Sequence, residues 1–374
     1  MTNKNHLKEV AKLFFKLGCI AFGGPASHIA MMEDEVVSKR KWMTRQHFLD
    51  LIGATNLIPG PNSTEMTMHC GYERAGWKGL IAAGGLFIFP AVVITLIFAW
   101  LYVNYGHLPN VQPIIYGIKP AVIAIILSAS YKLGKKALKS VELGLYGVLT
   151  ITACLYGSNE IIVLFGIGFI GLSAFFAKNI STTPKSIFPF MLLQVSTDYI
   201  SLGSWKIFFI FLKVGAILYG SGYVLFAFLD AELVANELLT RPELLDAIAV
   251  GQMTPGPVLS TATFIGYQLG GFPGAIAATI GIFLPSFIFV ALLNPLVHKI
   301  RKSPPLGAFL DAVNIAAVGV IIAVCYEMAR ESITDWRTIV IAILSIITVF
   351  GSNKLNSTFI VMGGALLGFI LYQF

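Results

Sequence analysis

Residues Asn56–Thr64 read N-L-I-P-G-P-N-S-T and residues Gln252–Ser260 read Q-M-T-P-G-P-V-L-S, so a Pro-Gly-Pro tripeptide interrupts an apolar run in each half of the chain. Proline removes a backbone donor and blocks the preceding helical turn, and a glycine between two prolines lets the backbone turn sharply. Such a break strands helix-end N–H and C=O groups, which a membrane interior tolerates only where protein or a polar cavity satisfies them. Two breaks in matching halves point to a transporter's binding site.

The composition indicates a membrane protein. Of 374 residues, 56% are hydrophobic and only 12% are charged, and the mean hydropathy is +0.79. Soluble domains carry roughly 25% charged residues, so this chain cannot cover a water-facing surface of its size. We therefore expect an all-α polytopic membrane protein. We accordingly interpret the formal net charge of +7 loop by loop, as evidence on membrane topology, and not as a sign of a nucleic-acid partner.

The sequence shows no chemistry of an enzyme. The four cysteines lie far apart in apolar surroundings and indicate neither a disulfide framework nor a zinc site. No metal-ligand cluster, nucleophile elbow or phosphate-binding loop is visible, so we expect no cofactor, no metal and no enzymatic activity. The N-terminal stretch lacks a cleavage-type small-residue site after its apolar run, and a removable signal peptide is not expected.

The first half contains a series of apolar runs. An initial run, Leu13–Phe22, is interrupted at Gly23-Gly24-Pro25, and the Pro-Gly-Pro segment extends over about Phe48–Cys70. Four long runs follow: Leu80–Tyr105, Ile114–Leu133, Leu143–Tyr156 and Ile161–Phe176. Each is close to the roughly 20 residues that cross a bilayer, the third only if it is tilted or extended at its ends.

The second half repeats the order of the first. F-K-L-G at Phe15–Gly18 matches L-K-V-G at Leu212–Gly215 (213 − 16 = 197 at the lysines), and G-Y-E-R-A-G-W-K-G at Gly71–Gly79 matches G-Y-Q-L-G-G-F-P-G at Gly266–Gly274 (266 − 71 = 195). A steady offset with single-residue slips indicates a duplication. The expected division is a first repeat at 1–178, a linker at 179–203 and a second repeat at 204–374.

The distribution of cationic residues indicates that the two repeats are inverted. In the first half, lysines gather in the loop after Ile114–Leu133, and the loops at 105–110 and 157–160 carry none. In the second half, the cations gather in the equivalent of the neutral loop, near Lys299 and Lys302. By the positive-inside rule the halves have opposite orientations, which requires an odd number of crossings in each. The simplest count is five transmembrane helices plus a broken or re-entrant Pro-Gly-Pro hairpin. Whether the first segment crosses or re-enters stays open.

The hairpin tips are the candidate substrate site. Pro61 precedes three polar residues that open a helix, and a helix N-terminus with amide and hydroxyl donors suits an oxyanion. The second tip carries Val258 and Leu259 instead, so the first looks more polar; a bend that serves packing alone is the alternative. The candidate binding residues at the two tips are Asn56, Gly60, Asn62, Ser63, Thr64, Gln252, Gly256, Ser260 and Thr261. The residues expected to break helices are Gly23, Gly24, Pro25, Pro59, Pro61, Pro255 and Pro257.

Two lysines and several acids complete the candidates. Lys16 and Lys213 share a repeat position within apolar runs; an intramembrane lysine costs about 2.5–3.5 kcal/mol and usually faces the bundle interior, where two would suit a divalent anion. Snorkelling to the interface is the alternative.

Glu65 and His69 share a helix face at i, i+4 spacing. We interpret them as candidate proton carriers, with a structural hydrogen bond as the alternative. Asp50 and Asp246 share a repeat position before each hairpin, and there we expect capping or a tie to a nearby arginine. His28 is expected to be structural.

Several linked motifs resemble a known family. F-G-G-P-A-S-H-I-A-M-M-E (Phe22–Glu33), N-L-I-P-G-P-N-S-T-E-M (Asn56–Met66), G-Y-E-R-A-G-W (Gly71–Trp77) and the second T-P-G-P resemble the chromate ion transporter family in its two-repeat form, over nearly the whole chain. The resemblance implies an integral protein of the bacterial inner membrane that moves chromate out of the cytoplasm, with homologous and oppositely oriented halves. Gly220-Ser221-Gly222 replaces the Gly-Gly-Pro motif in the second half.

The functional hypothesis is a secondary transporter of a tetrahedral oxyanion, with chromate first and sulfate as a possible competing substrate of similar size. The anion would sit between the hairpin tips and move by alternating access, driven by an ion gradient or by exchange. An anion channel lined by the same hairpins is the alternative, and Glu65 and Asp50 keep a neutral or cationic solute open. Glycine-rich faces at Gly79, Gly84 and Gly85 suit packing within the bundle or in a homodimer.

Overall fold

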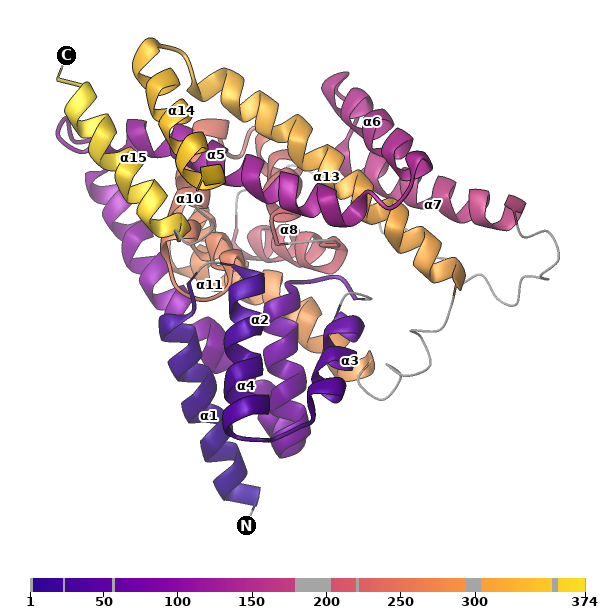
Figure 1. The fold of residues 1–374 in the computed structure, drawn as a ribbon. Coiled ribbons are helices and arrows are strands. Elements are labelled where there is room, and N and C mark those ends of the chain that lie inside the picture. The colour runs from indigo at the N-terminus through magenta and orange to yellow at the C-terminus, as the bar shows by residue number, and fades with distance from the viewer. Residues whose placement is uncertain are drawn as a thin grey trace.

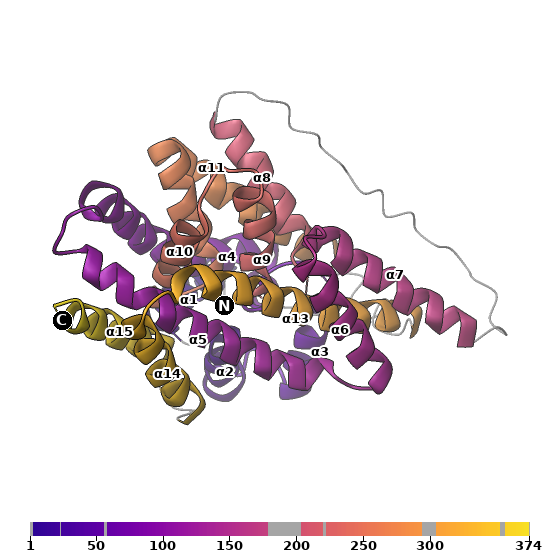
Figure 2. The ribbon, with the colours of Figure 1, turned by 90° about the horizontal axis from the view of Figure 1, so that it is seen from above.

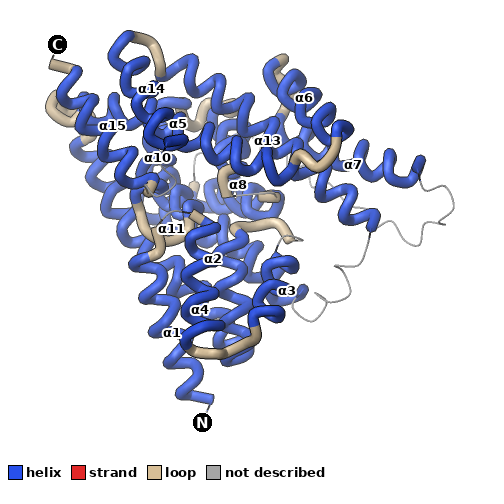
Figure 3. The backbone as a smooth tube through the Cα atoms, viewed as in Figure 1, coloured by secondary structure: helices blue, strands red, loops and turns tan. Residues whose placement is uncertain are grey.

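The computed structural model describes residues 3–22, 24–55, 58–178, 203–219, 222–293, 304–351 and 356–373. Throughout these ranges the chain is built from helices and connecting loops, without a strand (Figures 1 and 3). The helices long and apolar enough to cross a membrane, among the described residues, are Asn62–Tyr105, Gln112–Ala137, Glu160–Lys178, Val258–Leu292 and Pro304–Ser332. The prediction of an all-α polytopic membrane protein is confirmed.

The first half follows the predicted order of helices. Its elements are α1 (Asn3–Ile20), α2 (Pro25–Glu33), a π-helical turn η1 (Asp34–Lys39), α3 (Arg45–Thr55), α4 (Asn62–Tyr105), α5 (Gln112–Ala137), α6 (Val141–Leu155) and α7 (Glu160–Lys178). The predicted apolar runs coincide with the later part of α4 and with α5, α6 and α7. Glycine and proline mark the break between the first two helices, because Gly24 has φ 81° and Pro25 opens α2.

The second half has the same succession of elements. They are α8 (Ser204–Ile217), α9 (Val224–Leu229), η2 (Asp230–Val234), α10 (Arg241–Met253), a 3₁₀ turn η3 (Val258–Ser260), α11 (Thr261–Leu293), α13 (Pro304–Ser332), α14 (Trp336–Gly351) and α15 (Ser357–Leu371). The residues Gly220, Ser221, Lys299 and Lys302, used in the sequence argument, lie outside the described part of the chain.

A sharp turn inside α4 and another inside α11 have the same backbone geometry. Gly76 has φ 63° and ψ −151°, and Gly271 has φ 60° and ψ −151°. At each turn the helix folds back on itself, so that Gly71 packs against the backbone of Gly79, and Gly266 against that of Gly274. A side chain at these four positions would collide with a carbonyl of the other arm. The repeated G-Y motifs of the sequence therefore build a close crossing of two helical arms.

The two sequence halves exchange helices in the folded chain. Helix α1 packs on α4 and α8 packs on α11, each within its own half. By contrast, α5 packs on α14 and α15, whereas α13 packs on α6 and α7 (Figures 1 and 2). Small residues let these helices approach: Gly117 of α5 touches the backbone of Gly364 and Gly368, and Gly171 of α7 touches Ala312. The halves are thus interlocked.

The outward faces are apolar, as a lipid-facing surface requires. Large apolar side chains such as Ile81, Leu145, Ile162, Leu292 and Leu366 are each more than half exposed. Exposed large apolar side chains in this number are unusual for a soluble monomer and fit contact with another apolar phase. Several of the buried polar side chains lie at the two hairpin tips, among them Ser63, Thr64, Glu65, Ser260 and Thr261.

Candidate anion-binding site

The first Pro-Gly-Pro bend directs the N-terminus of α4 into the interior of the protein. Gly60 adopts φ 140°, a region that favours glycine, and Pro61 is extended before the helix begins at Asn62. The N–H groups of Thr64 and Glu65 both donate to the carbonyl of Pro61, at 2.8 and 3.1 Å. The aligned backbone dipoles give this end of the helix a partial positive charge.

A cavity of about 360 Å³ lies in front of this helix end. Its volume falls at the lower end of the roughly 300–1,000 Å³ typical of ligand pockets. Residues from the first hairpin, the end of α5, the start of α9 and one face of α13 line it. They are Ile58, Asn62, Leu133, Lys136, Ala137, Lys139, Val224, Gly307, Leu310, Asp311, Asn314, Ala317, Val318 and Ile321.

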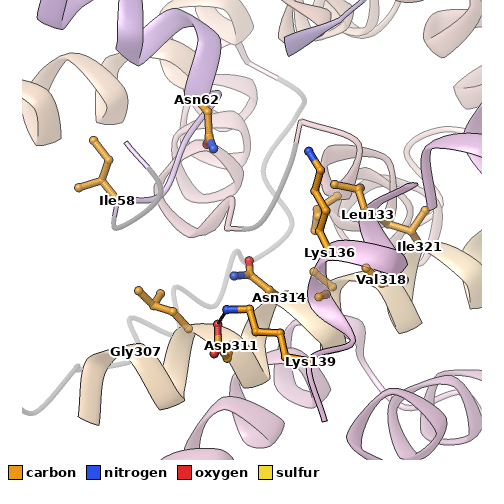
Figure 4. Close-up of a pocket in the computed structure, with 14 residues that line it drawn as sticks. Ile58, Asn62, Leu133, Lys136, Lys139, Gly307, Asp311, Asn314, Val318 and Ile321 are labelled. Atoms are coloured by element: carbon orange, nitrogen blue, oxygen red, sulfur yellow. Dashed lines mark hydrogen bonds and ion pairs between the residues drawn. The ribbon is translucent and has the colours of Figure 1, made fainter. Parts of the chain in front are cut away.

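The polar atoms of the cavity are mainly hydrogen-bond donors and cations. Figure 4 shows the amides of Asn62 and Asn314 pointing into the space from α4 and α13, with Lys136 extending along another wall. Lys139 forms an ion pair with Asp311 at 2.6 Å. Lys136 forms no ion pair within the described ranges, so its positive charge is not balanced by a neighbouring carboxylate. The arrangement favours an anion over a cation.

Sequence reasoning found only part of this cavity. Asn62 was among the predicted binding residues, but Lys136 and Lys139 were interpreted only as topological charges of a loop. Asn314 was missed because it lies within an otherwise apolar run, 252 residues along the chain from Asn62 (314 − 62 = 252). A polar amide in the middle of such a run is itself a signal that the sequence offered.

Ser63 forms a hydrogen bond with His28 of α2. Its hydroxyl lies 3.3 Å from Nδ1 of His28, whose Nε2 lies 3.1 Å from the carbonyl of Ala21. A carbonyl only accepts, so Nε2 carries the proton and donates it, and Nδ1 accepts from Ser63. This pair of hydrogen bonds ties the Gly-Gly-Pro break to the first hairpin and agrees with a structural role for His28.

The second hairpin is packed within protein. Gly256 adopts φ 87°, and its N–H donates to the carbonyl of Ala21 at 2.8 Å. Ser260 accepts from Thr95 at 3.3 Å, and the hydroxyl of Thr261 donates to the carbonyl of Val258 at 2.8 Å. Gln252 is buried, and its backbone carbonyl accepts hydrogen bonds from the hydroxyls of Ser357 and Thr358. None of these predicted binding residues lines the cavity at the first hairpin.

The bends themselves follow the predicted pattern. Pro59 and Pro61 flank Gly60, and Pro255 and Pro257 flank Gly256; Pro257 is extended before η3, as Pro61 is before α4. Gly60 donates its N–H to the carbonyl of Leu218 at 2.7 Å, as Gly256 does to Ala21. Each bend is therefore hydrogen-bonded to the other half of the chain. Gly23 and Asn56, two of the predicted residues, lie outside the described residues.

Lys16 and Lys213, at equivalent positions of the two repeats, each face a glutamate. Nζ of Lys16 lies 3.1 Å from Glu35, and Nζ of Lys213 lies 2.6 Å from Glu232. Their side chains are 53% and 38% exposed, and neither lines the cavity. Burial raises the pKa of Glu35, but the hydrogen bond from Lys16 and nearby cationic charges outweigh it, so that this pKa lies below its ordinary value. A dianion site built on these lysines stays a prediction, and their charges are already balanced.

Asp246, one of the two acids before the hairpins, differs from its expected role. Asp246 is buried, accepts from the hydroxyl of Tyr102 at 2.7 Å and lies 3.5 Å from Nζ of Lys119. Its partners are thus a tyrosine and a lysine from distant helices, and the expected arginine or cap is wrong for this residue. Asp50 accepts from Gln46, one turn before it, at 3.3 Å.

Curated relatives match almost the whole chain. The chain is 31% identical to the "Chromate transport protein" of Cupriavidus metallidurans, over 98% of this chain and 93% of that one. It is 29% identical to the "Probable chromate transport protein" of Synechococcus elongatus, over 98% and 96%, and 26% identical to the "Chromate transport protein" of Pseudomonas aeruginosa, over 96% and 91%. No solved structure matches the chain.

The family model described as "Chromate transporter" matches the chain twice, at residues 8–172 and 205–369. The two matches begin 197 residues apart (205 − 8 = 197), the offset of the two lysines in the sequence. This is a family of transporters and not of enzymes. A family match over both halves, together with whole-length relatives, shows that this chain belongs to the chromate transporter family.

Proposed function

We propose that this protein is a secondary transporter of a tetrahedral oxyanion, chromate first and sulfate as a competing substrate, that exports its substrate across the bacterial inner membrane. The names of the relatives from Cupriavidus metallidurans and Pseudomonas aeruginosa support chromate. Sulfate follows from its equal charge and similar shape. No ATP-binding motif is visible in the sequence, so an ion gradient or exchange supplies the energy.

The observation that carries the proposal is the cavity at the first hairpin. A helix N-terminus, two amide groups and the unbalanced charge of Lys136 converge on it. These groups favour an anion by charge and by hydrogen bonding, and they can satisfy several oxygens at once. Asn62 reaches the cavity directly, whereas Ser63, Thr64 and Gly60 support the bend that positions it.

The surroundings of the two hairpins differ, and this difference supports alternating access. The cavity lies beside the first hairpin, while at the corresponding place in the second half α10 packs against α5 and α15, and Asp246 binds Lys119 and Tyr102. If the repeats 1–178 and 204–374 are inverted, these two places face opposite sides of the membrane. One side is then open and the other closed, as a rocking carrier requires.

Equilibrium binding to the purified protein tests the proposal. We expect chromate and sulfate to bind, and Lys136→Gln to weaken binding by at least about tenfold, which corresponds to about 1.4 kcal/mol. Asn62→Ala should weaken it as well. Lys132→Gln is the matched control: this lysine belongs to the same cationic stretch but does not line the cavity.

Failure of both anions to bind the wild-type protein would overturn the proposal. Equal losses for Lys136→Gln and Lys132→Gln would assign the effect to general surface charge and remove Lys136 from the site. Counterflow of labelled chromate in liposomes then separates a carrier from a channel, because only a carrier accelerates uptake when unlabelled anion is present on the other side.

A further inference from the structure

A fully buried polar cluster lies behind the cavity, in the first turn of α4. Glu65 is 0% exposed, and neither of its carboxylate oxygens makes a hydrogen bond of ordinary geometry within the described residues. The hydroxyls of Thr64 and Ser286 are likewise buried without such a bond. Native structures contain few buried polar groups of this kind, and each calls for an explanation such as a bound proton, ion or water.

Glu65 and Ser286 enclose the bend of the first hairpin. A Cβ built on Gly60 would collide with both the carboxylate of Glu65 and the hydroxyl of Ser286. Ser286 belongs to α11, so the cluster joins the second half of the chain to the first hairpin. Ser286 lies close enough to Glu65 to interact with its carboxyl group. The carboxyl group therefore touches the segment that presents Asn62 to the cavity.

No cation balances a negative charge on Glu65 among the described residues. The titratable groups near it are Tyr219, from the segment after α8, His69, one turn further along α4, and His28 of α2, which is held by Ser63 and Ala21. The ion pairs of the described chain do not include Glu65. An unpaired buried carboxylate costs several kcal/mol, whereas a protonated one can donate to Ser286 and is far less costly.

We propose that Glu65 is a proton-binding site whose occupation is coupled to the anion in the cavity, so that a proton and the oxyanion bind together. The inference rests on the proposed function. Glu65 lies in the first turn of the helix whose N-terminus faces the cavity. An ionised carboxylate there cancels the partial positive charge of the helix end and repels a dianion, and protonation removes both effects.

The step is a simple protonation. A proton from water binds one carboxylate oxygen of Glu65, and no other bond forms or breaks. By linkage, the proton raises the affinity for the anion by the same factor as the anion raises the affinity for the proton. Anion affinity should rise by up to about tenfold for each unit of falling pH over the range in which Glu65 titrates.

Proton uptake on anion binding tests the inference. Sulfate and chromate are added to the purified full-length protein in weak buffer with a pH indicator, and blanks without protein remove the titration of the anion itself. The measurement is made over a series of pH values. Where Glu65 is ionised in the anion-free protein, we expect uptake of up to one proton for each bound anion, and over that range binding should tighten as the pH falls. In Glu65→Gln, which imitates the neutral form, the anion should bind with no uptake and with little dependence on pH. Glu73→Gln, an acid of the same helix that pairs with His47, should retain both effects.

The outcomes separate this inference from the proposed function. Binding to the wild-type protein with no proton uptake and no change of affinity at any pH of the series would overturn the role of Glu65 and leave the anion site intact. Absence of binding in both the wild type and Glu65→Gln would overturn the anion site and the coupling with it. If Glu65→Gln does not fold, the wild-type stoichiometry still decides, and Ser286→Ala should shift the pH dependence of binding without removing the uptake.

Discussion

At the scale of single residues, ion pairs account for the two lysines whose role the sequence left open. Lys16 and Lys213 lie at equivalent positions, and each binds a glutamate in the π-helical turn that follows, Glu35 in η1 and Glu232 in η2. The turns bring each glutamate back beside its lysine. Each lysine therefore has a local partner of opposite charge, and no substrate is needed to balance it.

The pair at Lys213 can be separated from a substrate role by a double substitution. Lys213→Met leaves Glu232 unpaired and should lower stability by about 1 kcal/mol and reduce transport. Adding Glu232→Gln removes the unpaired charge and should restore both. Thermal unfolding and vesicle transport provide the readouts. A double variant that is as stable as the wild type yet inactive would show that the lysine acts on the anion.

At the scale of elements, the Pro-Gly-Pro bends and the glycine crossings have separate structural roles within each hairpin. The bends end one helix and aim the next, because prolines exclude helical hydrogen bonds and Gly60 and Gly256 adopt positive φ. The crossings at Gly71 with Gly79, and at Gly266 with Gly274, hold the two arms of α4 and α11 together. Local composition predicted the bends, whereas the crossings emerged only from the folded arms.

Gly79 and Gly85 make a matched test of the crossing. A Cβ at Gly79 collides with the carbonyl of Gly71, while a Cβ at Gly85 has no heavy atom within 4 Å. Gly79→Leu should destabilise the protein by about 1–3 kcal/mol through overpacking, or prevent folding. Gly85→Leu on the same helix should be nearly neutral. Thermal unfolding in detergent compares them, and equal losses would mean that the close crossing is not important for stability.

At the scale of the whole molecule, the two halves are interlocked, and the proposed mechanism requires the contacts between them to change. Beside the second hairpin, Asp246 of α10 accepts a hydrogen bond from Tyr102 and pairs with Lys119. These residues lie on α4 and α5, so the contact joins the two halves. Beside the first hairpin the halves also touch, through the ion pair of Lys139 with Asp311, but a cavity of about 360 Å³ remains there. In the proposed alternating-access mechanism, transport requires the Asp246 contact to open.

Cross-linking Tyr102→Cys to Asp246→Cys, with the four native cysteines replaced, should stop transport and leave anion binding unchanged. The physical reason is that the cross-link prevents α10 from separating from α4 beside the second hairpin, while the cavity at the first hairpin stays accessible. Cleaving a reducible cross-linker should restore transport. A cross-link between Glu142→Cys and Lys178→Cys, which joins α6 to α7 within one half, serves as the control. Unchanged transport in the fully cross-linked Tyr102–Asp246 pair would contradict the model.

The sequence by itself determined the fold class, the positions of the apolar helices and the two breaks, because run length and the backbone chemistry of proline and glycine are local properties. It also placed Asn62 at a helix N-terminus. Only the tertiary structure brought Lys136 and Asn314 to the same cavity, exchanged α5 and α13 between the halves, and enclosed Glu65 beside Ser286. Those relations depend on how side chains separated by many residues pack together, and hydrophobic pattern does not specify that.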